Sequence, residues 1–504
     1  MEENYLFKHD ATFYAEQIIK QEESVHSLVQ NALTAIEQWN PRLNAVTQVQ
    51  TETALSQAEQ YDTYLSRLSD AEVQQLPPFY GVPILLKDLG QNQAKQPSAS
   101  GSKLFKEHQA KITDHFVKRI EAAGFIVVGR TNVPEFGFKN ISDSREFGAV
   151  ASPIDLKYNP GGSSGGAAAA LKAGLVPIVT ASDGGGSIRI PASFTGLIGL
   201  KTSRGRIPVG PFGYRGWQGA SVNFALTKSV RDTWRLLKWM QVEQIEAPFT
   251  MGKIVETELT PPTRPLKIAY STRSPIGGKV SDEAVKAVKQ TVKRLTALGH
   301  QVIEAEPSVD GIQVMRDYYV MNSVETGAMM QAIEEQRQEA LTYDDMEPIS
   351  WGLFQAGLKV SGIEYSKVID SWDRLAADTD AFFVREAIDL VLMPSTADVA
   401  PVQGQFELTG EQEECLRNMA HYNSKEQQAI IWQVFDKSLA LTPFTQQQNL
   451  TGQPAISLPV WKTASGFPLG VQFSARKGQE FVLLQLALQL EQAGFLSSQI
   501  TESD

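Results

Sequence analysis

The sequence predicts an α/β fold: a central, mixed and mostly parallel twisted sheet that helices cover on both faces. The first observation behind this prediction is the segment 112–132. It has the pattern of an amphipathic helix that stops at Gly124, followed by a strand from Phe125 to Val128. Because an α-helix between two strands is the usual crossover connection of parallel strands, the sheet should be at least partly parallel.

The same order of elements returns later in the chain, which is the second observation. The apolar stretch 266–270 reads as a strand, Ser281 caps a helix with an inward apolar face, and Gly299 precedes a strand at Val302 and Ile303. Two stretches look like connectors, residues 245–265 and 342–350, but neither is long or flexible enough to insist on separate domains. We therefore predict a single domain over residues 1–504.

Three parts of this domain differ in character. Residues 1–70 are expected to form an N-terminal helical arm, because apolar positions between Asp10 and Glu37 recur at the spacing of one or two amphipathic helices. Residues 75–235 hold the motifs that carry chemistry. Residues 310–440 are helical in pattern and are expected to shape a pocket.

The composition excludes several classes of function. The chain has 504 residues and a formal net charge of −11, which argues against a nucleic-acid surface built on clustered Lys and Arg. It has no apolar run near the roughly 20 residues of a membrane span, and the polar start MEENYLFKHD lacks a signal-peptide pattern, so we expect a cytoplasmic protein without a membrane partner. The single cysteine, Cys415, rules out an intrachain disulfide, and its acidic surroundings disfavour a reactive thiolate.

Two stretches rich in glycine and serine are NPGGSSGGAAAALKAG (159–174) and TASDGGGSIRIP (180–191). Neither matches a phosphate-binding loop: Ala167 stands where a Walker loop needs lysine, and Arg189 where a dinucleotide fingerprint starting at Gly184 needs its last glycine. Two uses remain open for such turns. One is close packing of the backbone, and the other is a group of backbone N–H donors facing a developing negative charge.

The hydroxyls beside these glycines indicate nucleophilic chemistry. Ser163, Ser164 and Ser187 lie in the glycine-rich turns, and Lys87 closes the apolar strand of FYGVPILLKDLG (79–90). All six histidines lie outside these turns. A serine nucleophile without histidine needs another base, and a buried, neutral lysine is the usual substitute. Spacing alone does not establish that these groups meet.

These motifs resemble those of the amidase signature family. The match rests on GGSSGGAAAALKAG, SDGGGSIRIPASFTGLIGLKTSRGRIP and GVPILLKD, and it continues through VGRTNVPEFGF to NLTGQPAISLPV near the end. The resemblance implies a hydrolase that cleaves amides with a Ser-cis-Ser-Lys triad, with no metal and no organic cofactor. By position, Ser187 would be the nucleophile, Ser163 the bridging serine and Lys87 the base.

The resemblance also implies roles for neighbouring residues. The N–H groups of Gly184, Gly185, Gly186 and Ser187 would form the oxyanion hole. Asp183 and Arg189 would brace the loop, or simply pair with each other. Ser164 would stabilise its own turn through a hydrogen bond to the backbone.

Two features separate the chain from one branch of the family. Ile190 stands where the glutamine-dependent tRNA amidotransferase subunit usually has glutamine, and the segment 204–221 resembles the branch that includes the 6-aminohexanoate cyclic-dimer hydrolases. We therefore expect a stand-alone hydrolase of small-molecule amides. An amidotransferase subunit that passes ammonia to an aminoacyl-tRNA and a catalytically silent binding protein are the alternatives, and a homodimer is one expectation for the oligomeric state.

Overall fold

An eleven-stranded mixed sheet forms the centre of the computed structural model, which describes residues 6–496. The strand order is β1-β3-β2-β6-β8-β7-β12-β13-β11-β9-β10. These strands are β1 (Val46–Val49), β2 (Pro83–Lys87), β3 (Ile126–Thr131), β6 (Ile178–Asp183), β7 (Ile198–Lys201), β8 (Val222–Thr227), β9 (Lys267–Tyr270), β10 (Gln301–Glu304), β11 (Leu390–Pro394), β12 (Ala455–Lys462) and β13 (Pro468–Ser474). A separate hairpin joins β4 (Asp143–Ser144) to β5 (Gly148–Ala149).

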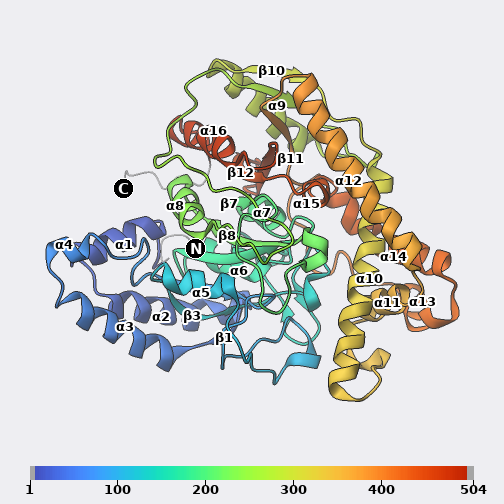
Figure 1. Ribbon diagram of the computed structural model, residues 1–504, viewed down its shortest axis with the longest axis horizontal. Coiled ribbons are helices and arrows are strands. Elements are labelled where there is room, and N and C mark those ends of the chain that lie inside the picture. The colour runs from blue at the N-terminus through green and yellow to red at the C-terminus, as the bar shows by residue number, and fades with distance from the viewer. Residues whose placement is uncertain (1–5, 497–504) are drawn as a thin grey trace.

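Helices cover the sheet on both faces and extend beyond it on two sides (Figure 1). They are α1 (Ala11–Ile19), α2 (Val25–Leu43), α3 (Thr51–Leu65), α4 (Asp70–Val73), α5 (His115–Ala122), α6 (Gly165–Lys172), α7 (Arg189–Thr195), α8 (Val230–Met240), α9 (Asp282–Ala297), α10 (Gly311–Arg337), α11 (Pro348–Gly357), α12 (Gly362–Arg385), α13 (Gly410–Arg417), α14 (Ser424–Leu441), α15 (Gln446–Thr451) and α16 (Glu480–Gln492). The predicted α/β class with a mixed central sheet is confirmed. Figure 1 shows α1–α4 on one side of the sheet and α10, α11, α13 and α14 on the opposite side.

The parallel pairs lie in two outer groups of strands. β3, β2 and β6 run parallel at one end, and β11, β9 and β10 run parallel at the other. The strands between β6 and β11 pair antiparallel, as do β1 and β3. Both segments that predicted the fold class belong to the parallel groups, because α5 leads into β3 and α9, capped by the Ser281 side chain, leads from β9 to β10.

The first 70 residues include a strand as well as helices. α1 and α2 occupy the segment in which one or two amphipathic helices were expected, and their apolar faces are buried against the body. β1 then joins the edge of the central sheet beside β3. Its sequence, Val-Thr-Gln-Val, is too short to show a clear periodicity of apolar residues, and only its pairing with β3 identifies it as a strand. Residues 1–5 lie outside the described part of the chain.

Residues 310–440 are mainly helical, as the pattern indicated. α10, α11, α13 and α14 enclose a second apolar cluster that is centred on Tyr319, Leu353 and Phe435. One strand, β11, interrupts this region and pairs with β9 and β13 in the central sheet. Within residues 6–496, no helix has the length and apolar character needed to cross a membrane.

The sheet brings distant chemistry-bearing residues to one edge. β2 and β6 are parallel neighbours, so Lys87, which ends β2, and Asp183, which ends β6, lie at the same edge. β8 pairs antiparallel with β6, and its first residue, Val222, faces Asp183. The segment just before β8, which contains Trp217, therefore lies beside the turn that follows β6.

Candidate active site

Lys87 is fully buried, and its amino group meets two serine hydroxyls. Its Nζ donates to Ser163 Oγ at 2.8 Å, to Ser182 Oγ at 2.9 Å and to the Ser182 carbonyl oxygen at 3.4 Å. Burial lowers the pKa of Lys87 to about 7, although the nearby Asp183 carboxylate acts in the opposite direction. A substantial fraction of Lys87 is therefore neutral near pH 7, which a general base requires.

Ser163 lies in a crowded turn before α6, after a cis peptide bond between Gly162 and Ser163. Gly137 packs against its hydroxyl, so that a Cβ at Gly137 would lie only 3.1 Å from Ser163 Oγ. The predicted meeting of Lys87 and Ser163 is present in the geometry. Sequence reasoning missed Ser182, the second hydroxyl at the lysine, and Gly137, whose φ of +72° favours glycine.

Ser164 makes hydrogen bonds to the backbone, as expected, but its partner lies outside its own turn. Its hydroxyl donates to the Ser182 carbonyl oxygen at 3.3 Å and accepts from the Ser182 N–H at 3.4 Å. The bond thus ties the Ser163–Ser164 turn to β6, rather than closing the turn on itself. The difference arises because the carboxyl end of β6 lies directly beside this turn, with buried backbone groups that need partners.

Three glycines precede Ser187, and side chains from other segments pack directly on each of them. A Cβ at Gly184 would lie 2.9 Å from the Trp217 ring, and one at Gly185 would lie 2.3 Å from the Tyr318 hydroxyl oxygen. One at Gly186 would lie 2.2 Å from Thr445 Oγ1, and Gly186 also has a φ of +125°. Close packing therefore requires all three glycines. Ser187 itself is half-buried, and no hydrogen bond within the described residues uses its hydroxyl.

The four N–H groups expected as oxyanion donors are not equivalent. The Gly186 N–H donates to Asp183 Oδ1 at 2.7 Å, so it is engaged within the protein. Within residues 6–496, the N–H groups of Gly184, Gly185 and Ser187 take part in no hydrogen bond. The sequence could not show this distinction, because it depends on how the Asp183 carboxylate folds back over its own turn.

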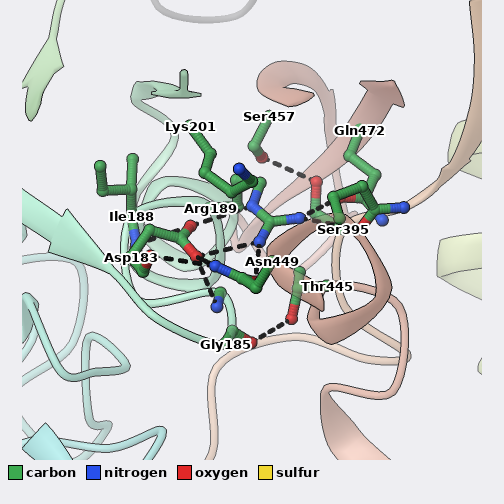
Figure 2. Close-up of polar contacts among 12 residues, drawn as sticks. Asp183, Gly185, Ile188, Arg189, Lys201, Ser395, Thr445, Asn449, Ser457 and Gln472 are labelled. Atoms are coloured by element: carbon green, nitrogen blue, oxygen red, sulfur yellow. Dashed lines mark hydrogen bonds and ion pairs between the residues drawn. The ribbon is translucent and has the colours of Figure 1, made fainter. Parts of the chain in front are cut away.

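Asp183 and Arg189 form a fully buried ion pair under this turn. Arg189 Nε and Nη2 each donate to Asp183 at 2.9 Å, and the Ile188 N–H donates to the same carboxylate at 3.3 Å (Figure 2). Burial alone would raise the pKa of Asp183, but the Arg189 guanidinium, with help from Lys201 and Asn449, outweighs it and lowers the pKa to about 2. The carboxylate is therefore ionised, and the expected brace by Asp183 and Arg189 matches these contacts.

The C-terminal part of the chain supplies partners that sequence reasoning did not assign. Arg189 Nη1 donates to Gln448 and Gln472, and its Nη2 donates to Asn449. Figure 2 shows Asn449, from α15, and Gln472, from β13, beside the guanidinium. The only sequence feature that pointed to these partners was the segment NLTGQPAISLPV, which begins with Asn449. It was one of the motifs that resemble the family, but none of its residues was given a role.

Aromatic side chains lie over the same turn. Trp217 contacts the Gly184 position, and its ring lies nearly parallel to Phe138, at 14° with ring centroids 6.2 Å apart. Tyr318 meets Trp217 edge-on, at 75° and the same centroid distance. All three rings are only partly buried. They form an apolar wall, here called the aromatic wall (Phe138, Trp217 and Tyr318), beside Ser187.

Comparison with known proteins decides the family. The family model described as Amidase matches residues 27–484. The chain belongs to the amidase family. A lipoamidase of Enterococcus faecalis is 36% identical over 488 residues, which cover 95% of this chain and 62% of that protein. The chain thus spans less than two thirds of the lipoamidase.

Two further comparisons cover nearly the whole of both chains. A 6-aminohexanoate-cyclic-dimer hydrolase of Paenarthrobacter ureafaciens is 32% identical over 493 residues, covering 96% of this chain and 94% of that protein. The solved structure of a 6-aminohexanoate cyclic dimer hydrolase complexed with substrate is 30% identical, covers 97% of each chain and superimposes with a TM-score of 0.84. These similarities confirm the predicted family and show that the protein is an amide hydrolase.

Proposed function

We propose that this protein hydrolyses small-molecule amides through Ser187 as nucleophile, Ser163 as proton bridge and Lys87 as base. The observation that carries the proposal is the buried Lys87 amino group, 2.8 Å from Ser163 Oγ. Its pKa near 7 and the half-buried Ser187 at the same sheet edge support the assignment. Metal and organic cofactors have no part in it.

The proposed reaction begins with two proton transfers. Neutral Lys87 takes the proton of Ser163 as Ser163 takes that of Ser187, and Ser187 Oγ forms a bond to the amide carbonyl carbon. The tetrahedral intermediate then loses its amine as the C–N bond breaks. Ser163 gives the amine nitrogen a proton and recovers one from Lys87. Water attacks the resulting acyl-enzyme by the same proton path, which releases the acid and restores neutral Lys87.

The N–H groups of Gly184, Gly185 and Ser187 are the proposed donors to the oxyanion. We assign the fourth group, Gly186 N–H, to the Asp183 carboxylate instead, since that bond is already 2.7 Å long. The donors cost no reorganisation when charge develops on the substrate oxygen, because Asp183, Arg189 and the packed side chains hold the turn.

The aromatic wall favours amides with an apolar or aromatic part next to the reacting carbonyl. Phe138, Trp217 and Tyr318 offer ring surface on one side of the turn. The names of the relatives, lipoamidase and 6-aminohexanoate-cyclic-dimer hydrolase, agree with small organic amides as substrates. A cytoplasmic location without nucleic-acid or membrane partners, and a homodimer, remain predictions from the sequence.

Amine release from a panel of amides tests the proposal. The panel contains glutamine, aliphatic and aryl amides, peptide amides and cyclic lactams, with wild type and Ser187→Ala side by side. We expect turnover of at least one amide other than glutamine and a loss of about 10⁴-fold or more in Ser187→Ala. Full activity in Ser187→Ala would refute the nucleophile. Turnover of glutamine alone would favour the amidotransferase alternative.

A further inference from the structure

Thr445 is the only side chain described in residues 6–496 that hydrogen-bonds a carbonyl of the three-glycine turn. Its Oγ1 donates to the Gly185 carbonyl oxygen at 2.7 Å, as Figure 2 shows. Thr445 comes from the start of α15, 260 residues further along the chain, and it is fully buried. The Thr445 hydroxyl is therefore removed from water, while Gly185 is partly buried.

Thr445 occupies a position at which its side chain would ordinarily serve its own helix. It is the N-cap residue of α15, where a threonine hydroxyl usually accepts a hydrogen bond from a backbone N–H of the first turn. No such capping bond is formed. The nearest alternative acceptor, Gln446 Oε1, is 3.4 Å away, much further than the Gly185 carbonyl. The hydroxyl is thus directed at the glycine turn.

The bond has a consequence for one peptide group. The Gly185 carbonyl and the Gly186 N–H belong to the same peptide unit, which is planar. Thr445 holds the carbonyl end, and Asp183 Oδ1 holds the N–H end at 2.7 Å. Glycine on both sides would otherwise let this unit rotate freely, because glycine tolerates both signs of φ. The two bonds together fix it in one orientation.

We propose that Thr445 is a positioning residue for catalysis: by anchoring the Gly185–Gly186 peptide, it aims the flanking Gly185 and Ser187 N–H groups at the substrate oxyanion. The inference rests on the proposed function, since it needs the turn to be the oxyanion site. Thr445 does not touch the substrate. Without its hydroxyl, the Gly185 carbonyl loses its partner and the peptide turns, so that the neighbouring donors lose their alignment.

The test compares Thr445→Ala with Thr445→Ser, two variants that differ by one hydroxyl. The probes are 4-nitrophenyl butyrate as substrate and octyl trifluoromethyl ketone, whose adduct with serine carries an oxyanion. We expect kcat in Thr445→Ala to fall about 10- to 100-fold with little change in KM, and the affinity for the ketone to fall in parallel. Thr445→Ser should recover most of both losses.

Two controls separate positioning from general destabilisation. Thr451→Ala removes another buried hydroxyl from the same helix. The Thr451 hydroxyl bonds the Gln447 carbonyl oxygen and the Gln453 side chain instead of the glycine turn, so this variant should retain the kcat of wild type. Melting temperatures show whether each variant is folded. Thr445→Val is a second variant without the hydroxyl, and it replaces Thr445→Ala if that variant does not fold.

Other results would overturn the inference. Unchanged kcat and ketone affinity in Thr445→Ala or Thr445→Val would show that the bond does not aim the donors. Losses that Thr445→Ser fails to recover would assign the effect to the methyl group and its packing. Either result, combined with an inactive Ser187→Ala, leaves the proposed function standing, whereas an active Ser187→Ala removes the proposed function itself.

Discussion

Two lysines end strands at the same edge of the sheet, and they differ in what their amino groups meet. Lys87 ends β2 and Lys201 ends β7, and both are fully buried. Burial lowers the pKa of each to about 7. Lys87 Nζ lies against the hydroxyls of Ser163 and Ser182, whereas Lys201 Nζ donates to the carbonyl oxygen of Thr202 at 2.9 Å.

The comparison shows that a lowered lysine pKa does not by itself identify a base. The Arg189 guanidinium also disfavours the charged form of Lys201, and the Asp183 carboxylate acts on both lysines in the opposite direction. A base also needs a hydroxyl proton within reach and a path from it to the nucleophile. Of the two lysines, only Lys87 has such a hydroxyl at its amino group, whereas Lys201 favours the ionised form of the Asp183 carboxylate.

The largest expected effect is a loss of kcat when the Lys87 amino group is removed, and removal of the Lys201 amino group is its comparison. Lys87→Met should lower kcat by about 10³-fold or more, because the proton of Ser163 loses its acceptor. Lys201→Met should lower kcat by about 10-fold at most, because it removes a charge neighbour and no proton acceptor. Steady-state hydrolysis of an aryl amide measures both. Equal losses in the two variants would remove the distinction between the lysines.

The next effect concerns the two hydroxyls at Lys87. Ser163→Ala should lower kcat by about 10²- to 10³-fold, somewhat less than loss of the lysine, since a water molecule can partly replace the bridge. Ser182→Ala is the matched control, because Ser182 Oγ lies 2.9 Å from the same Nζ. We expect its loss to stay near 10-fold, within the range of one disturbed hydrogen bond. A larger loss in Ser182→Ala would make Ser182 the bridge.

The pH dependence of kcat/KM should follow the protonation of Lys87 and should not depend on Lys201. Lys87 acts as a base only when neutral, and its pKa is about 7. Activity measured as kcat/KM should therefore be constant above that pH and fall about tenfold for each pH unit below it. Lys201→Met should keep this profile. A profile that flattens in Lys201→Met would contradict the assignment.

The smallest effect is on stability. Lys201 has a pKa of about 7 in the folded protein and near 10.5 when unfolded, so between these values the unfolded chain binds more protons. This lysine therefore makes the free energy of unfolding rise with pH from about 7 to 10.5. Lys201→Met should reduce that rise, as measured by urea unfolding at pH 7 and pH 9. An unchanged pH dependence would show that Lys201 is charged in the folded protein.

Local patterns were enough to predict much of the fold and part of the site. The strand ending at Lys87, the helix capped by Ser281 and the glycine turn before Ser187 all follow from short-range rules of burial, capping and backbone freedom. The family resemblance then supplied roles for Lys87, Ser163 and Ser187.

The rest depends on contacts between segments far apart in the chain. Thr445, Asn449 and Gln472 meet the nucleophile turn across about 260 to 280 residues of sequence. The segment that opens with Asn449 entered the family resemblance, but no local pattern shows which of these side chains contact the turn. The second buried lysine, Lys201, sits in an ordinary apolar strand, and only the packing around it reveals its burial. The engagement of the Gly186 N–H with Asp183 likewise depends on a side-chain orientation.

The most direct test of Lys87 as the base for Ser187 is the rate at which a fluorophosphonate probe labels Ser187 between pH 5.5 and 9. The rate is followed by intact-mass spectrometry and the site by peptide mapping, in wild type, Lys87→Met and Lys201→Met. We expect labelling of Ser187 to rise through a midpoint near the Lys87 pKa of about 7, to persist in Lys201→Met and to fall about 10²-fold or more in Lys87→Met. Labelling of Lys87→Met at the wild-type rate and pH dependence would contradict this role of Lys87.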